Sequence, residues 1–302
     1  MAEFVSVEET ARRWDVSPRS VRGYCSQGRV PGSVLEGKTW LIPFGAEKPG
    51  REKRHPAPGR ESILAMLRRE KDAGMPGGLY HACQIELTYN SNHIEGSRLS
   101  HEQTRWIFET KTIGTGDGNV RVDDIIETVN HFRCVDLVID SAGRKLTEAF
   151  IKQLHFVLKN GTSDSQKSWF KVGDYKMLAN EVGGMETARP EEVPARMKNL
   201  LAGYNAGTKL SLDDILDFHV QFEGIHPFQD GNGRGGRLVL FRECLRHGIT
   251  PFIITEELKF FYYRGLREWR NERGYLRDTC LTAQDEFRRR FWSLLPPAGS
   301  LR

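Results

Sequence analysis

The sequence predicts a mainly α-helical protein in which a small domain precedes a larger helical bundle. From residue 61 onward, apolar residues recur at three- and four-residue spacing and most of these segments end at glycine, as amphipathic helices do. Residues 44–60 are rich in proline, glycine and charge without such periodicity, which predicts a linker. The length of 302 residues accommodates one large core and one smaller module.

Two short helices are predicted at the start of the chain. Ser6, followed three residues later by Glu9, is typical of a capping box, and the helix that it opens runs to about Trp14. Ser17 caps a second helix in residues 18–28, whose first position is a proline, where a missing N–H group is tolerated. The chain therefore begins with a helix, a tight turn and a second helix.

The next residues, 30–43, predict a short β-hairpin. Taken together, residues 1–43 resemble the small winged helix-turn-helix modules of the MerR and excisionase type. The resemblance implies that the second helix enters a DNA major groove, with Arg19, Ser20 and Arg22 facing DNA. A module that binds another protein, with these arginines in solvent, is the alternative.

Charge and composition restrict the partners and the compartment. Residues 1–60 hold 11 Lys and Arg against 7 Asp and Glu, whereas the rest of the chain holds 33 of each sign, which favours an acidic partner at the N-terminus. No apolar run approaches the ~20 residues of a membrane span, and the start lacks the pattern of a signal peptide. The five cysteines are scattered and never spaced as Cys-x-x-Cys. We expect a cytoplasmic protein with reduced thiols and no membrane partner.

The larger domain is predicted to occupy residues 61–302. Its one break in helical periodicity is residues 169–190, where apolar and polar residues alternate around a Gly-Gly pair. This pattern is typical of a β-hairpin. We therefore expect a hairpin that projects from a helical body.

The segment HPFQDGNGRGGR, residues 226–237, carries the chemistry. It follows an amphipathic helix that ends at Gly224, and a new helix is predicted to begin near Gly233 or Arg234. Glycines let backbone N–H groups approach a ligand closely, and the dipole at a helix N-terminus favours an anion. Phosphate is the predicted ligand.

The charged residues of this segment fit that ligand. Arg234 and Arg237 lie about one turn apart, so two guanidinium groups can hold phosphate oxygens from one side. Asp230 and a phosphate group are both negatively charged and repel each other, but a Mg²⁺ ion bound between Asp230 and a pyrophosphate group would remove this repulsion. His226 then fits as a proton acceptor, because the ordinary pKa of histidine is near neutrality.

These residues match the Fic motif, H-x-F-x-(D/E)-G-N-G-R-x-x-R, at every specified position, and the chain resembles the Fic/DOC family over about residues 61–280. The resemblance implies a Fic-type helical bundle with a β-hairpin flap and the activity of a protein adenylyltransferase. His226 would deprotonate a Ser, Thr or Tyr hydroxyl of a target protein, which attacks the α-phosphate of ATP while pyrophosphate leaves. Phe228 would pack the loop into the core.

The resemblance also assigns binding residues. Asp230 would hold Mg²⁺ between the α and β phosphates of ATP, and Arg234 would stabilise the charge on the leaving pyrophosphate. Further phosphate contacts are assigned to Gly231, Asn232, Gly233, Gly235 and Arg237.

Two outlying segments are assigned in the same way. The flap, residues 169–190 with Lys176, Met177 and Leu178, would add the target segment as a strand, although Lys176 stands where the family more often has arginine. Tyr262 and Tyr263 match an aromatic pair on the adenosine side of the nucleotide in relatives, whereas helical spacing alone makes them core residues.

A second pattern concerns control. SNHIEG, residues 91–96, fits the family's inhibitory pattern (S/T)-x-x-x-E-(G/N), with Ser91 and Glu95 in place. The resemblance implies an inhibitory helix of about residues 81–96, whose Glu95 reaches Arg237 and occupies the space of the γ-phosphate. ATP would then bind in an unreactive pose.

Two alternatives stay open at this point. One is a DNA-binding regulator whose Fic domain only senses nucleotide, which leaves His226 unexplained. The other is a Fic enzyme that removes AMP or transfers another nucleotide or phosphocholine. The sequence also leaves open whether the target is the protein itself and whether the chain forms a homo-oligomer.

Overall fold

The computed structural model describes residues 4–26, 28–36, 39–49, 61–114, 119–182, 185–291 and 294. The described residues fall into two compact units, one drawn from residues 1–58 and 260–282 and the other from 59–259 and 283–302. Residues 50–60 of the predicted linker lie outside the described residues. The predicted domain boundaries at residues 43 and 60 stay predictions.

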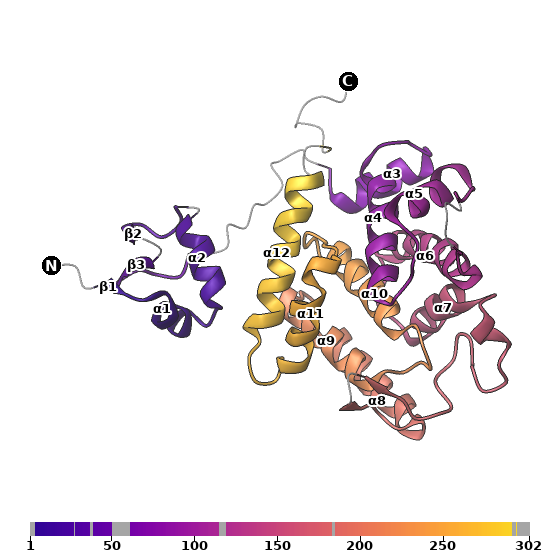
Figure 1. Ribbon diagram of the computed structural model, residues 1–302. Helices are drawn as coiled ribbons and strands as arrows, with labels where there is room; N and C mark the ends of the chain where they lie inside the picture. Colours follow the sequence, from indigo (N-terminus) through magenta and orange to yellow (C-terminus); the bar gives the residue numbers. More distant parts are fainter. Residues whose placement is uncertain are drawn as a thin grey trace. The chain divides into compact units, whose positions relative to one another are not determined.

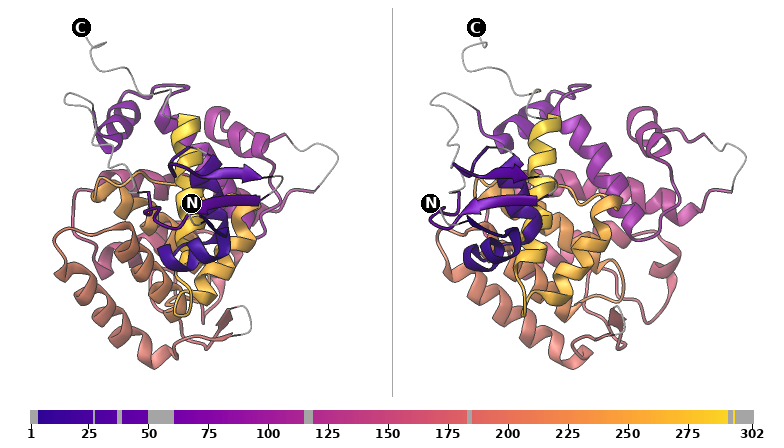
Figure 2. Two further views of the ribbon diagram at one scale, coloured as in Figure 1. Left: turned by 90° about the vertical axis from the view of Figure 1, so that its left-hand side faces the viewer. Right: turned by 60° about the vertical axis from the view of Figure 1, so that its left-hand side comes forward.

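The N-terminal part of the first unit follows the expected order of elements. These are β1 (Phe4–Val5), α1 (Val7–Trp14), α2 (Pro18–Ser26), β2 (Val34–Glu36) and β3 (Thr39–Pro43). The Ser6 hydroxyl accepts a hydrogen bond from the Glu9 backbone N–H at 3.1 Å, so α1 begins where the capping pattern predicts. The strands are antiparallel in the order β1-β3-β2 and lie beside the two helices, all in indigo in Figure 2.

A small apolar core holds these elements together. It is formed by Val7, Ala11, Trp14, Val21, Cys25, Val30 and Ile42. The core residues of α1 and α2 recur at three- or four-residue spacing, as helical periodicity predicts. The predicted hairpin is present as β2 and β3, while residues 37 and 38 between them lie outside the described residues. The winged helix-turn-helix identity of the module stays a prediction.

The second unit is built from helices. They are α3 (Ile63–Asp72), α4 (Leu79–Ile94), α5 (His101–Thr110), α6 (Val122–Ser141), α7 (Glu148–Lys159), α8 (Val193–Ala206), α9 (Leu212–Ile225) and α10 (Asn232–Arg246), with the short 3-10 helices η1 (Ser163–Gln166) and η2 (Pro190–Glu192). Two further helices, α11 (Glu256–Glu268) and α12 (Gly274–Phe291), have residues in both units. The mainly helical prediction is confirmed.

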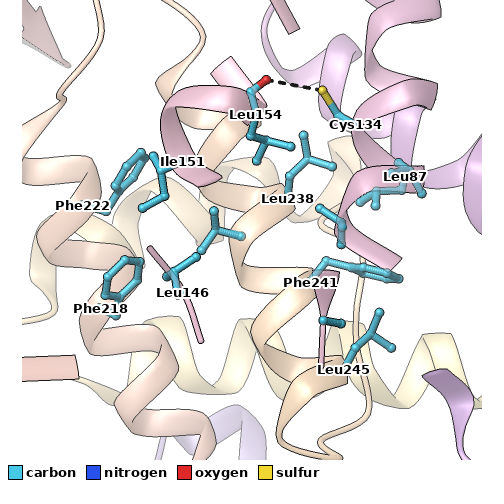
Figure 3. Close-up of a cluster of buried hydrophobic side chains, with 14 of the residues drawn as sticks. Leu87, Cys134, Leu146, Ile151, Leu154, Phe218, Phe222, Leu238, Phe241 and Leu245 are labelled. Atoms are coloured by element: carbon cyan, nitrogen blue, oxygen red, sulfur yellow. Dashed lines mark hydrogen bonds between the residues drawn. The ribbon is translucent and has the colours of Figure 1, made fainter. Parts of the chain in front are cut away.

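Helix α10 lies at the centre of the second unit (Figure 1) and packs against α3, α4, α6, α7 and α9. Figure 3 shows how the core forms from side chains of several of these helices, with Leu238 and Phe241 of α10 between Phe222 of α9 and Leu87 of α4. The Cys134 thiol of α6 donates a hydrogen bond to the Leu154 carbonyl of α7 at 3.5 Å. This core fixes the start of α10, and therefore the motif.

The predicted flap contains less strand than its alternation suggests. Strands β4 (Glu181–Val182) and β5 (Met185–Glu186) pair with each other, but residues 169–180 contain no strand. Backbone groups of this segment bond to the motif loop instead. The Lys176 N–H donates to the Pro227 carbonyl at 2.9 Å, and the Leu178 N–H donates to the Gln229 side chain at 3.1 Å.

Two smaller findings concern membrane-spanning segments and the cysteines. Among the described residues, no helix is both long and apolar enough to cross a membrane. All five cysteines, which are buried, carry free thiols, as the scattered spacing predicts.

Candidate active site

The motif loop joins α9 to α10 through two residues with left-handed backbone. His226, the C-cap of α9, has φ 51° and ψ 63°, a conformation that few residues other than glycine adopt. Gly231, the N-cap of α10, has φ 80°, which glycine adopts without strain. Helix α10 begins at Asn232, one residue before the earliest start that the sequence predicts.

Asn232 braces the loop. Its side-chain oxygen accepts from the Phe228 N–H and its side-chain nitrogen donates to the Phe228 carbonyl, both at 2.8 Å. The side-chain amide is therefore engaged within the loop, so the predicted phosphate contact of Asn232 would have to come from its backbone.

Phe228 packs into the core, as predicted, and its partner there is a histidine. The His155 ring of α7 stacks on the Phe228 ring with centroids 3.9 Å apart and an interplanar angle of 2°. His155 Nδ1 accepts from the Gly173 N–H at 2.9 Å, which leaves Nε2 to donate to the Asp230 carbonyl at 3.1 Å. Burial lowers the pKa of His155 to about 4, so the ring stays neutral and holds the loop against α7.

The imidazole of His226 is in the form that a base requires. Burial and then the nearby Lys176 ammonium lower the pKa of His226 to about 4, so the ring is neutral at pH 7. The Glu223 backbone also forms a hydrogen bond with the ring, so one ring nitrogen donates and the other is left as the acceptor. That nitrogen can accept a proton from a ligand hydroxyl.

Arg237 is held by the C-terminal end of α4. Its Nε donates to the Ser91 hydroxyl at 3.0 Å, and its Nη2 donates to the Ser91 carbonyl at 2.9 Å and to Glu95 Oε1 at 2.7 Å. Burial opposes ionisation of Glu95, but Arg237 and then Arg234 outweigh it and lower the pKa of that carboxyl. The structure thus brings together Ser91, Glu95 and Arg237, as the sequence predicts.

Arg234 and Asp230 belong to a cluster that the sequence did not reveal. Arg234 contacts Glu127 of α6 at 2.5 Å and Asp230 at 3.3 Å. The Lys159 ammonium, at the end of α7, lies 2.6 Å from both Glu127 and Asp230. Burial alone would raise the pKa of Asp230, but Arg234 and Lys159 lower it well below its usual range, so the carboxylate is ionised.

The flap segment is tied to the loop by Lys176, whose backbone N–H donates to the Pro227 carbonyl. Its buried ammonium donates to the Asn180 side chain at 2.6 Å and to the Thr187 hydroxyl at 2.7 Å. Burial lowers the pKa of Lys176 to about 8. Met177 and Leu178 next to it are exposed, at 51% and 49% of their surface. The predicted flap residues therefore divide into a buried anchor and an exposed face.

Close packing requires a glycine at position 233 of the motif but not at position 235. A Cβ atom at Gly233 would overlap Glu95 Oε1 and lie 3.1 Å from Arg237 Nη1, whereas a Cβ atom at Gly235 would meet nothing within 4 Å. Gly233 therefore leaves room for the Glu95 carboxylate. At Gly235, which is buried, packing of other side chains does not require a glycine.

The predicted adenosine and DNA residues belong to the first unit and stay predictions. Tyr262 is 1% exposed and Tyr263 is 39% exposed. Arg22 forms an exposed ion pair with Glu8 at 2.8 Å. The Arg19 guanidinium lies 5.7 Å from the centroid of the Phe261 ring.

Ser20, the third predicted DNA-facing residue, lies in α2. Its backbone N–H donates to the Ser17 hydroxyl at 3.2 Å, which caps α2 as the sequence predicts.

A metal ion at this site would be held by one protein carboxylate and by the phosphates of the nucleotide. No cluster of three or more His, Cys, Asp or Glu side chains suited to a metal occurs in the described ranges. Asp230 is ionised and its side chain is 49% exposed. Since Mg²⁺ in nucleotide sites is usually held by one or two carboxylates and the phosphates, Asp230 fits the ion that the resemblance implies.

Comparison with known proteins finds similarity in the part of the chain that carries the motif. Residues 145–243 match the Fic/DOC family. Protein adenylyltransferase Fic of Aedes aegypti is 24% identical over 206 residues, which cover 67% of this chain and 38% of that protein. Protein adenylyltransferase fic-1 of Caenorhabditis elegans is 27% identical over 183 residues, which cover 59% of this chain and 35% of that protein. The chain thus spans less than two fifths of the length of these relatives.

Solved structures agree on the fold. A Fic domain containing signaling protein from Bacteroides thetaiotaomicron superposes with a TM-score of 0.60 and 25% identity, over 76% of this chain and 94% of that one. Fic-1 of Caenorhabditis elegans superposes with a TM-score of 0.58 and 19% identity, over 76% of this chain and 71% of that one.

Proposed function

We propose that this chain is a protein adenylyltransferase that transfers AMP from ATP to a hydroxyl group of a target protein, because residues 145–243 match the Fic/DOC family and the fold is similar to that of a Fic domain containing protein. The observation that carries the proposal is the neutral His226 imidazole, which has one ring nitrogen that can accept a proton. It lies in the loop that opens α10. The names of the curated relatives, protein adenylyltransferases, support the same reaction.

In this reaction His226 takes the proton of a target Ser, Thr or Tyr hydroxyl. The hydroxyl oxygen forms a bond to the α-phosphorus of ATP, the bond from that phosphorus to the bridging oxygen breaks, and pyrophosphate leaves with the electron pair. The N-terminus of α10 and Arg234 stabilise the negative charge that develops on the phosphates. Asp230 would hold Mg²⁺, which neutralises phosphate charge when bound.

We further propose that the end of α4 inhibits this reaction. Glu95 and Ser91 use donor groups of Arg237 that would otherwise be available to the terminal phosphate of ATP. A carboxylate beside Arg237 also repels that phosphate. ATP would therefore bind in a pose that does not react until Glu95 moves away.

The target is proposed to bind along the flap. Met177 and Leu178 expose apolar surface beside the loop that carries His226. An extended target segment that pairs with this part of the chain would bring its hydroxyl to His226. Buried Lys176 would keep the segment in place.

The test is incorporation of α-³²P-labelled ATP into protein by the parent chain, Glu95→Gly, and Glu95→Gly combined with His226→Ala. We expect weak labelling by the parent, strong labelling by Glu95→Gly and none by the double variant. Parallel reactions with γ-labelled ATP should give no labelled protein, since the γ-phosphate leaves in pyrophosphate. Label from the γ position would instead show phosphate transfer.

The same reactions decide between the other Fic activities. If all three proteins fold but remain unlabelled, the next substrates are other nucleotides, phosphocholine donors and proteins that already carry AMP. Release of AMP from such a protein would assign the opposite reaction.

DNA binding is a second candidate for residues 1–43, supported by the paired helices α1 and α2, the β2–β3 hairpin and the excess of basic residues. Binding of labelled duplex DNA by the full chain, compared with Arg19→Ser and Arg22→Ser variants, tests it. If either arginine binds a DNA phosphate, its replacement should weaken binding and reduce the salt dependence of the affinity.

A further inference from the structure

The cluster around Asp230 contains a buried cation that the proposed reaction does not use. Lys159 ends α7 and its side chain is only 2% exposed. Its ammonium lies 2.6 Å from Asp230 Oδ2, 2.6 Å from Glu127 Oε1 and 3.5 Å from Asp164 Oδ2. A lysine that is buried to this extent is normally paired, and here one of its partners is the motif carboxylate.

The position of Lys159 is fixed by packing as well as by charge. A Cβ atom on Gly231 would lie 3.4 Å from the Cγ and Cδ atoms of Lys159, so the lysine stem runs close to the N-cap of α10. The ammonium also lies 5.7 Å from the centroid of the Phe170 ring. The side chain is therefore enclosed on several sides and does not need a ligand to hold it.

The charges of the four central groups balance one another. Lys159 and Arg234 carry two positive charges, and Glu127 and Asp230 carry two negative charges, with each cation in contact with both carboxylates. A divalent cation that approached Asp230 alone would meet two positive charges within a few ångströms. The triphosphate of ATP adds several negative charges and reverses that balance.

From this geometry we propose that Lys159 is a resident cation at the motif carboxylate: it pairs with Asp230 when no nucleotide is bound and makes divalent metal binding depend on the nucleotide. Free metal then binds weakly, and metal enters together with ATP. Lys159 acts through Asp230, so it is a positioning residue and not a group that reacts. The inference rests on the proposed nucleotide-dependent function of the site, but its test does not depend on transfer activity.

The test measures binding of Mn²⁺ alone to the full chain, without nucleotide, by the loss of the electron paramagnetic resonance signal of free Mn²⁺. The variant Lys159→Met keeps the length and apolar stem of the side chain but removes its charge. We expect it to bind Mn²⁺ about tenfold more tightly than the parent chain, because one repelling charge next to Asp230 is gone. Adding Asp230→Ala to this variant should remove the gain.

Two controls make the result specific. Lys152→Met removes another α7 lysine, which pairs with Glu148 and Asp174 at 3.0 and 2.9 Å, and should leave Mn²⁺ affinity unchanged. Lys159→Arg keeps the charge and should bind Mn²⁺ as weakly as the parent. If Lys159→Met does not fold by circular dichroism, Lys159→Gln, whose amide can still donate to Glu127, replaces it.

A folded neutral variant that binds Mn²⁺ no more tightly than the parent would overturn the proposal. So would an equal gain in Lys152→Met, since it would reflect general charge only. If the parent chain transfers no AMP but Lys159→Met gains Mn²⁺ affinity, the role of Lys159 stands and the proposed function fails. If the parent chain transfers AMP but Lys159→Met gains no Mn²⁺ affinity, the proposed function stands and the role of Lys159 fails.

Discussion

Glu95 and Arg237, separated by 142 positions in the sequence, form an ion pair of 2.7 Å between the C-cap of α4 and the first turns of α10. The Arg237 side chain is 4% exposed and the Glu95 side chain 30% exposed. The pair therefore has a fixed arginine and a carboxylate that solvent or a ligand can reach. Such a pair can be opened from the carboxylate side without unfolding α10.

Ser91 should contribute to the same restraint, but less than Glu95. The change Ser91→Ala removes the hydrogen bond from Arg237 Nε and leaves those to the Ser91 carbonyl and to Glu95. One such bond contributes about 1 kcal/mol, so we expect roughly a fivefold increase in AMP transfer. Transfer from α-labelled ATP, measured beside Glu95→Gly, checks the order parent, Ser91→Ala, Glu95→Gly. Equal transfer by Ser91→Ala and the parent would contradict a role for this bond.

Gly233 and Gly235 should respond in opposite ways to alanine. A Cβ atom at Gly233 would overlap Glu95 Oε1, whereas one at Gly235 would meet nothing within 4 Å. Gly235→Ala should raise the free energy of unfolding by up to about 1 kcal/mol, because alanine favours a helix interior. Gly233→Ala should lower it by about 1–3 kcal/mol, since the Glu95 side chain must leave its place. Urea unfolding of both variants makes the comparison, and equal values would show that Glu95 does not occupy this space.

Glu127 should be needed to hold Arg234 in position. The change Glu127→Gln keeps the size of the side chain but removes the charge that contacts both Arg234 and Lys159. We expect AMP transfer in the Glu95→Gly background to fall by about tenfold, because a misplaced donor no longer meets the charge on the leaving group. The matched control is Glu109→Gln, whose carboxylate pairs with His81 and Arg105 at 3.0 Å. A similar loss in the control would point to a general effect of charge.

Glu223 should make the protein less stable as the pH rises. Burial raises the pKa of this carboxyl to about 7, although Arg237 opposes the shift and Glu95 adds to it. His219 Nε2 lies 4.0 Å away. The folded state therefore binds a proton that the unfolded state has lost, and stability falls between about pH 4.5 and pH 7.

The change Glu223→Gln should remove that loss. The free energy of unfolding should be up to about 3 kcal/mol higher than that of the parent at pH 8 and nearly the same at pH 4. Chemical denaturation of both proteins at the two pH values measures the difference, and the comparison cancels the titration of all other groups. A difference that does not change with pH would show that Glu223 titrates normally.

Much of the fold and the outline of the site could be predicted from the sequence. Local rules were sufficient for Ser6 and Pro18, because a cap and a first helical position depend on neighbours within four residues. The residues of the motif at 226–237 specified the loop, because a phosphate site at a helix N-terminus requires these residue types. The contact of Arg237 with α4 was implied by the resemblance of residues 91–96 to the inhibitory pattern of the Fic/DOC family. The predicted flap was less successful, since alternation of apolar residues does not show whether backbone groups pair with a strand or with the motif loop.

The sequence by itself determined the helical bundle and the loop between α9 and α10, while the pairing of Glu95 with Arg237 was implied by the resemblance to the Fic/DOC family. Only the tertiary structure showed that His155 supports Phe228, that the Asn232 side chain braces the loop, and that Glu127 and Lys159 surround Asp230 and Arg234. His155, Glu127 and Lys159 come from α6 and α7, and no spacing along the chain relates them to the motif. Their pairing follows from burial, because charged groups in a packed interior must find partners wherever the helices bring them together.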